Sequence, residues 1–218
     1  MRGITVQRSG TRRRQGRPTS AVLTRAAIGQ AALRQIDAAG YAAMTMKALA
    51  ADLGVAPSAL YNHVRGKHDL LRLVQDALME QVDVSAFDDQ PLRAAVADWA
   101  RSYRDVFAAH PQVIQHISVL PVTDAPRTLD RYEAVAAALA AGGVPPEQVV
   151  PVIVAFESFI YGSALDVGAP ADIFEAGSAD RSHPQFTAAV AAQHAATDDP
   201  AEEAFELGLG ALLALVPA

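Results

Sequence analysis

A run of small, hydroxyl, amide and imidazole side chains, free of carboxylates, occupies residues 57–63. Groups of this kind can hydrogen-bond to base edges and phosphates in the major groove of DNA, which would repel a carboxylate. An amide such as that of Asn62 can pair with adenine. The alternative is an ordinary helical hairpin with a polar outer face. The side chains expected to project outward are Ser58, Ala59, Tyr61, Asn62 and His63.

Two short helices with a glycine turn between them are expected to present these side chains. Thr45 is a candidate N-cap for a first helix over residues 46–53, and Gly54 can supply the left-handed end of that helix. The second helix, over residues 57–64, begins with proline, whose missing N–H costs nothing in a first turn. A longer amphipathic helix over residues 20–40 precedes both. This order predicts a helix-turn-helix arrangement.

Charge is divided unevenly along the chain. Residues 1–80 hold twelve Lys and Arg against five Asp and Glu, a net charge of +7, whereas residues 81–218 hold six against nineteen, a net charge of −13. Such a division is typical of a protein whose N-terminal part meets a polyanion. Residues 1–19 are expected to form a flexible arm that enters the minor groove, binds phosphates without sequence preference, or is merely solvated. The arm residues concerned are Arg12, Arg13, Arg14 and Arg17.

Helical periodicity continues through the rest of the chain, and no window alternates convincingly enough for a strand. We therefore expect an all-α fold. Helices are predicted over residues 67–82, 92–107, 112–120, 127–141, 146–165, 185–195 and 200–216. The polar stretch 85–90 is the expected boundary, which gives a DNA-binding domain over residues 20–66, a connecting helix over 67–84 and a second helical domain over 85–218.

Two motifs carry a family resemblance: Met44-Thr45-Met46-Lys47-Ala48-Leu49-Ala50, and Leu53-Gly54-Val55-Ala56-Pro57-Ser58-Ala59-Leu60-Tyr61-Asn62-His63-Val64. Together with Lys67 they make residues 33–81 similar to the DNA-binding domain of the tetracycline-repressor (TetR) family, and residues 116–169 more weakly resemble the C-terminal domain of the tetracycline repressor. The resemblance implies a homodimer that binds double-stranded operator DNA and a small-molecule effector. It also implies that bases are read by Lys47, Pro57, Ser58 and Ala59, and that the DNA backbone is contacted by Thr45, Tyr61, His63 and Lys67.

An aromatic stripe on the helix over residues 92–107 is the candidate effector site. Trp99, Tyr103 and Phe107 stand at i, i+4 and i+8, for which core packing is the default interpretation, although the resemblance implies that this helix lines the effector cavity. His116 lies near the position of a metal-coordinating histidine, but the other matching positions disagree, so a magnesium–tetracycline ligand is not expected. We expect an apolar or aromatic effector without metal or cofactor, with further contacts from Phe156, Glu157 and Tyr161.

The last two long helices are expected to form the dimer interface. They carry more apolar surface than one core contact needs, and the resemblance implies an intersubunit four-helix bundle. A two-fold axis would set two recognition helices one DNA turn apart, which requires a near-palindromic operator. The effector would shift the connecting helix and lower operator affinity, so that the protein acts as a repressor. The interface residues expected are Val152, Phe159, Phe205, Leu209, Leu212 and Leu213.

Other classes of protein fit the sequence poorly. No cysteine is present, which excludes a disulfide framework and cysteine-ligated metal. No nucleophile elbow, phosphate loop or His-Glu-x-x-His motif occurs, so an enzyme is not expected. The longest apolar runs, 134–144 and 207–216, are shorter than the roughly 20 residues of a bilayer span, and no apolar stretch follows the N-terminal arginines. We expect a cytoplasmic protein without membrane contact. The alternative function is an architectural or effector-independent DNA-binding protein, which the long acidic half disfavours.

Overall fold

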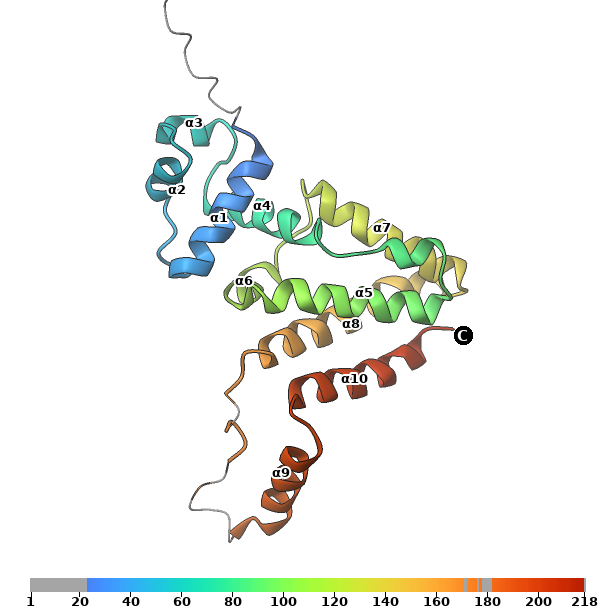
Figure 1. Ribbon diagram of the computed structural model, residues 1–218. Coiled ribbons are helices and arrows are strands. Elements are labelled where there is room, and N and C mark those ends of the chain that lie inside the picture. The colour runs from blue at the N-terminus through green and yellow to red at the C-terminus, as the bar shows by residue number, and fades with distance from the viewer. Residues whose placement is uncertain (1–22, 171, 176, 178–181, 218) are drawn as a thin grey trace, which may run out of the picture.

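A computed structural model of the chain describes residues 23–170, 172–175, 177 and 182–217. Every regular element within these ranges is a helix, which confirms the all-α prediction (Figure 1). The arginines of the expected arm, Arg12, Arg13, Arg14 and Arg17, lie outside the described residues.

Three helices form the N-terminal unit: α1 (Arg25–Ala39), α2 (Met46–Asp52) and α3 (Pro57–Tyr61). Hydroxyl caps begin the first two, because Thr24 accepts a hydrogen bond from the N–H of Ala27 and Thr45 accepts one from the N–H of Ala48. Gly54 turns the chain between α2 and α3 with a φ of 65°, a left-handed conformation that favours glycine. The unit is held together by a core that includes Ile28, Ile36, Leu49 and Leu60.

Helix α4 (Lys67–Met79) packs against α1 and then continues to the C-terminal unit, where it contacts α7 (Pro126–Ala141). Its contact with α1 is close. A Cβ atom added to Gly29 would lie 2.6 Å from the carbonyl oxygen of Leu73, so the two backbones approach too closely for any larger residue. Helix α4 therefore belongs to both units and links them mechanically.

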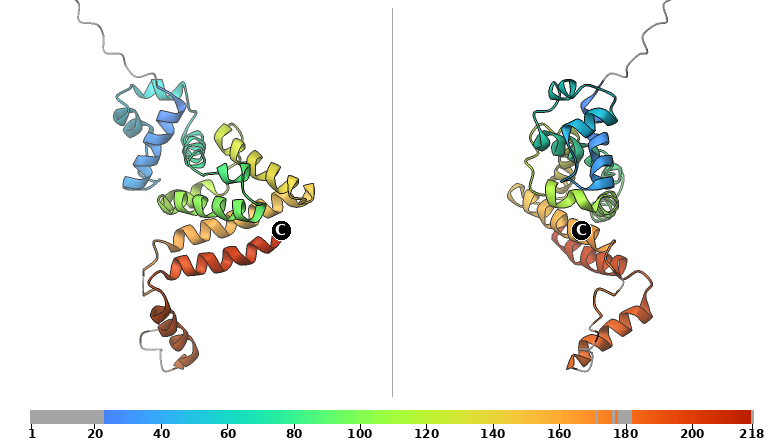
Figure 2. Two further views of the ribbon diagram at one scale, coloured as in Figure 1. Left: turned by 45° about the vertical axis from the view of Figure 1, so that its right-hand side comes forward. Right: turned by 90° about the vertical axis from the view of Figure 1, so that its left-hand side faces the viewer.

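The C-terminal unit begins with the 3₁₀ helix η1 (Ser85–Asp88) and α5 (Leu92–Ala108). Helix α8 (Pro146–Asp166) packs between α5 and α10 (Pro200–Leu212), and these three helices run side by side (Figure 2). Helix α6 (Pro111–Ile117) bridges α1 and the C-terminal unit. Helix α9 (Pro184–Ala196) stands away from the rest, and it has no buried residue.

Helix ends differ from the sequence prediction by a few residues. Helix α3 ends at Tyr61 because the N–H groups of His63 and Val64 both bond to the carbonyl of Leu60, which tightens the chain into a turn. Helix α4 ends at Met79 and gives way to turns through Val82. The last helix changes at Leu213 into a 3₁₀ turn, η3 (Leu213–Leu215).

Helix α8 has 21 residues and is long and apolar enough to cross a membrane by length and composition alone. Its buried side chains, Val149, Val152, Ile153, Phe156, Ile160 and Ala164, pack in the core between α5 and α10. The hydropathy of this helix is therefore also that of a core helix.

Candidate nucleic-acid and effector sites

Helices α2 and α3 present the side chains expected to read DNA. Ser58 and Asn62 are exposed and Tyr61 is 56% exposed, whereas Leu60 of α3 is buried in the core. Pro57 and Lys47 are exposed as well, whereas Ala59 and His63 are half-buried. Within the described residues, α3 and the turn after it present no carboxylate. The surface is therefore a short polar ridge suited to a groove of DNA.

Two of the expected backbone-contacting residues have partners within the chain. The hydroxyl of Thr45 caps α2, and the ammonium group of Lys67 lies 5.2 Å from the centroid of the Tyr41 ring. The carbonyl of His63 accepts a hydrogen bond from Nη1 of Arg25 at 2.8 Å. The Arg25 contact ties the turn after α3 to the start of α1, and the Lys67 contact ties the start of α4 to the segment after α1.

An aromatic cluster fills the centre of the C-terminal unit. Trp99 is 2% exposed, and Tyr103, Phe107 and Phe156 are completely buried. The Trp99 ring lies 5.8 Å from Tyr103 and 5.9 Å from Phe156, centroid to centroid, in edge-to-face and tilted arrangements that favour aromatic pairs. Four of the residues expected at the effector site therefore lie together, as core packing.

A carboxylate and three phenols lie at the edge of this cluster. Oε1 of Glu157 accepts hydrogen bonds from Tyr103 at 2.9 Å and from Tyr132 at 2.6 Å. The hydroxyl groups of Tyr103 and Tyr161 lie 2.8 Å apart. Burial raises the pKa of Glu157 above its ordinary value, and burial together with the neighbouring carboxylate raises the pKa of Tyr132. The phenols thus stay protonated and act as donors.

Among the buried side-chain atoms without a hydrogen-bond partner in the described part of the chain, two belong to uncharged residues. They are Nε1 of Trp99, a donor, and Oε1 of Gln75, an acceptor on α4 that is 3% exposed. Leaving a buried donor or acceptor without a partner costs about 1–3 kcal/mol. A ligand that supplied the missing partners would recover that free energy.

His116 lies elsewhere than the aromatic cluster. Its ring is 4.2 Å from the ring of Tyr41, centroid to centroid, and nearby His110 bonds through Nδ1 to Oδ2 of Asp37 at 2.9 Å. Both histidines belong to α6 or its N-cap, and both partners come from the end of α1 or just after it. The structure therefore places His116 at the junction of the two units.

The residues expected at a dimer interface face the interior of this chain. Val152, Phe205 and Leu209 are buried, and Phe159 stacks on Phe205 with centroids 5.4 Å apart. Leu212 and Leu213 are half-buried. A Cβ atom on Gly208 would lie 2.4 Å from the Phe159 ring, so this glycine allows the close packing of α10 on α8. The exposed apolar side chains of these two helices are instead Val150, Val154, Leu165 and Leu207.

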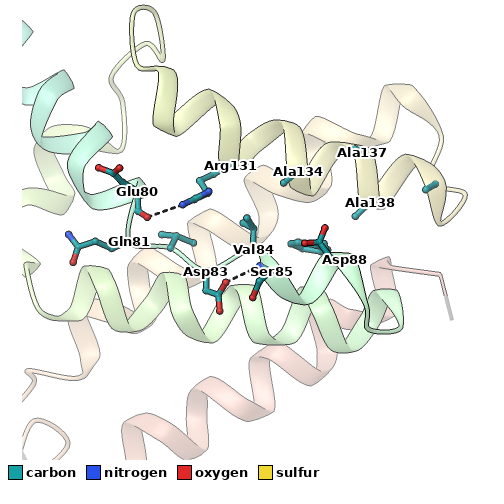
Figure 3. Close-up of a pocket in the computed structure, with 13 residues that line it drawn as sticks. Glu80, Gln81, Asp83, Val84, Ser85, Asp88, Arg131, Ala134, Ala137 and Ala138 are labelled. Carbon is teal, nitrogen blue, oxygen red and sulfur yellow. Dashed lines mark hydrogen bonds between the residues drawn. The ribbon is translucent and has the colours of Figure 1, made fainter. Parts of the chain in front are cut away.

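A groove of about 800 Å³ lies between α7 and the segment that joins α4 to α5 (Figure 3). Ala134, Ala137 and Ala138 of α7 line one wall, and the stretch from Asp83 to Asp88 lines the other. Arg131 donates hydrogen bonds to the carbonyls of Met79 and Glu80, which are the last residues of α4 and its C-cap. The groove thus adjoins the attachment of α7 to the end of α4.

Sequence patterns predicted no role for Tyr132, Arg131 or the pair Asp76 and Thr128. Tyr132 could have been found, because it stands three and seven residues before the buried Val135 and Leu139 on one stripe of its helix. The contacts of Arg131 to main-chain carbonyls and of Asp76 to the N–H of Thr128, at 2.9 Å, leave no pattern in the sequence. In the described part of the chain, no group of three or more His, Asp or Glu is placed to hold a metal ion.

Comparisons with known proteins agree with this arrangement. A family model described as bacterial regulatory proteins, tetR family, matches residues 28–74, and one described as tetracyclin repressor-like, C-terminal domain, matches residues 87–216. The HTH-type transcriptional repressor DrrR1 of Streptomyces coeruleorubidus is 29% identical over 155 residues, which are 71% of this chain and 57% of that protein. An HTH-type transcriptional regulator of Saccharopolyspora erythraea is 31% identical over 145 residues, 66% of this chain and 61% of that one. The match therefore spans less than two thirds of both relatives.

Solved structures show the same architecture. The apo form of ActR from Streptomyces coelicolor superposes with a TM-score of 0.73 at 27% identity and covers 89% of this chain and 94% of that chain. ActR in complex with actinorhodin gives a TM-score of 0.71 at the same identity, with coverage of 89% and 96%. The fold is thus shared with solved structures over most of the chain.

Proposed function

Because this chain belongs to the tetR family of bacterial regulatory proteins, we propose that it is a ligand-responsive repressor that binds a near-palindromic operator as a homodimer. The family makes it a transcriptional regulator with a DNA-binding and a C-terminal domain. The observation that carries the proposal is the exposed, carboxylate-free surface of α3 and the turn after it, from Ser58 to Asn62, beside exposed Lys47. Such a protein would act in the cytoplasm.

The proposed effector is a small apolar or aromatic molecule that enters the core around Trp99. ActR, which shares the fold, is solved in complex with small molecules, so this architecture can admit them. In this chain the unpartnered donor of Trp99 and the unpartnered acceptor of Gln75 favour a ligand that has both an acceptor and a donor. Aromatic walls favour a planar ring system. Because Gln75 lies on α4, its contact with a ligand would bear on the helix that carries the DNA-binding unit.

The proposed dimer would cover the exposed apolar faces of α8 and α10. Val150 is 65% exposed and Leu207 78% exposed, and both lie on helices whose opposite faces are buried. Helix α9 gives independent support, since it carries no Asp, Glu, Lys or Arg and is buried nowhere in a single chain. An uncharged helix that is mostly alanine and other apolar residues, with no buried residue of its own, is expected to be covered in an assembly.

The decisive experiment selects bound DNA from a random duplex pool at a stated physiological salt concentration. The wild-type protein is compared with Lys47→Ala, Asn62→Ala and the control Arg127→Ala, which removes a positive charge of α7 and its exposed ion pair with Glu80. We expect an enriched inverted repeat, about tenfold or more weaker binding by Lys47→Ala, and a changed base preference in Asn62→Ala, since a good base contact is worth about 1–3 kcal/mol. The control should bind as the wild type does.

Binding that is only unspecific and salt-sensitive would contradict the operator-reading function and favour the architectural alternative. The same operator then tests the effector. An aromatic ligand that releases the wild-type protein from DNA supports a regulated repressor, because a ligand must bind two states unequally to shift them.

A further inference from the structure

A polar pocket of about 300 Å³ lies at the turn between α3 and α4, next to the proposed DNA-reading surface. Three guanidinium groups and two carboxylates line it, together with Tyr61, Asn62 and His63 of the reading surface. The charged residues are Arg25, Arg65, Arg72, Asp69 and Asp124. The pocket thus carries a net positive charge beside side chains that face DNA in the proposed function.

Internal contacts hold two of the three guanidinium groups, those of Arg25 and Arg72, in place. Arg25 donates to the carbonyl of His63, as described above, and Asp69 accepts one hydrogen bond from the N–H of Arg65 at 2.9 Å and another from Nη1 of Arg72 at 3.0 Å. Asp69 is therefore occupied within the turn. Nε of Arg72 is buried and makes no hydrogen bond within the described residues. Arg72 thus retains one unused N–H donor among the residues that line the pocket.

Asp124 comes to this pocket from the other unit of the molecule. It lies in the connection between α6 and α7. Among the described residues other than glycine, Asp124 is the one with a positive φ, 61°. The next residue, Ala125, is completely buried, and Thr128 of α7 bonds through its N–H to Asp76 of α4. Asp124 is thus anchored to the junction of α7 and α4, and a strained conformation held by its surroundings is typical of a functional position.

We propose that this pocket receives a backbone phosphate of the operator and that Asp124 is a built-in competing anion that lowers operator affinity. The proposal rests on the proposed DNA-binding function and adds to it a direct electrostatic contact between the regulatory unit and the DNA-binding surface. A displacement of α4 relative to α7 would carry Asp124 toward or away from the phosphate site. The effector-binding unit would then act on DNA through charge as well as through the spacing of the recognition helices.

Asp124→Asn tests this directly, because asparagine tolerates a positive φ and keeps the size of the side chain. The control is Asp130→Asn, which removes one exposed carboxylate from α7 outside the pocket. Operator affinity is measured at 50 and 200 mM salt. We expect Asp124→Asn to tighten binding about two- to fivefold for each bound protomer at the lower salt and less at the higher, as for charges separated by solvent. Asp130→Asn should leave the affinity near that of the wild type.

The basic side of the pocket is tested with Arg65→Gln. This change keeps the main-chain N–H of residue 65, which donates a hydrogen bond to Asp69. We expect this variant to weaken binding to all sequences alike and to reduce the slope of log K against log salt by about one for each lost phosphate contact. In the Arg65→Gln background the gain from Asp124→Asn should shrink. Equal effects of Asp124→Asn and Asp130→Asn on a protein that binds its operator would overturn the inference. A wild-type protein that reads no operator would overturn the proposed function instead.

Discussion

The buried carboxyl of Glu157 makes the stability of the fold depend on pH. Burial raises its pKa from 4.5, the hydrogen bonds from Tyr132 and Tyr103 lower it, and burial has the larger effect. In the folded state the carboxyl therefore holds its proton to higher pH than it does in the unfolded chain. The fold therefore loses stability as the pH rises from the ordinary pKa of glutamate through the raised pKa of Glu157.

Replacing Glu157 with Gln is expected to remove this part of the pH dependence. Since the amide does not ionise and still accepts a hydrogen bond, the free energy of unfolding should fall less between pH 4.5 and pH 8 than in the wild type. Urea unfolding at a series of pH values measures the difference, with Glu147→Gln on the same helix, an exposed carboxyl, as the control. Parallel curves for the wild type and Glu157→Gln would contradict the assignment of a raised pKa.

The close contact between α1 and α4 requires glycine at position 29, which has no side chain. Gly29→Ala is expected to destabilise the fold by about 1–3 kcal/mol, because the new Cβ would meet backbone that cannot rotate away. The matched control is Gly162→Ala in α8, where nothing lies within 4 Å and alanine should stabilise the helix by about 0.5–1 kcal/mol. Thermal or urea unfolding reports both signs, and similar effects from the two changes would refute the close approach of α1 and α4.

The sequence predicted the helices better than it predicted their partners. Caps, glycines and prolines act locally, so Thr45, Gly54 and Pro57 locate the helix-turn-helix from the sequence alone. An apolar stripe does not say whether its cover comes from the same chain or from a second copy. Phe205 and Leu209 were therefore predicted at the dimer interface from the sequence, but they are buried in the core of this chain. His116 was assigned by its position along the chain, whereas its contact with Tyr41 depends on how α6 folds back on α1.

The faces that a single molecule leaves exposed allow a test of its assembly. Leu207→Asp is expected to weaken the dimer at least about tenfold and to lower operator affinity with it, because a charge would be buried at the interface. Val119→Asp is the control, since Val119 is 82% exposed and lies on the connection after α6. Sedimentation at micromolar concentration gives the oligomeric state. A monomeric wild type, or equal effects of the two changes, would contradict the proposed dimer.

Because α4 contacts both α1 and α7, it limits how domains can be exchanged between regulators of this architecture. Helix α4 shares a close backbone contact with α1 and a hydrogen-bonded contact with α7 through Asp76 and Thr128. A hybrid made by joining the reading unit of this chain to the sensing unit of a relative inherits one of these contacts intact and must reconstruct the other. A junction placed before Lys67 breaks the first, and one placed after Met79 breaks the second. Recombination between such proteins therefore favours parents that already agree along this one helix.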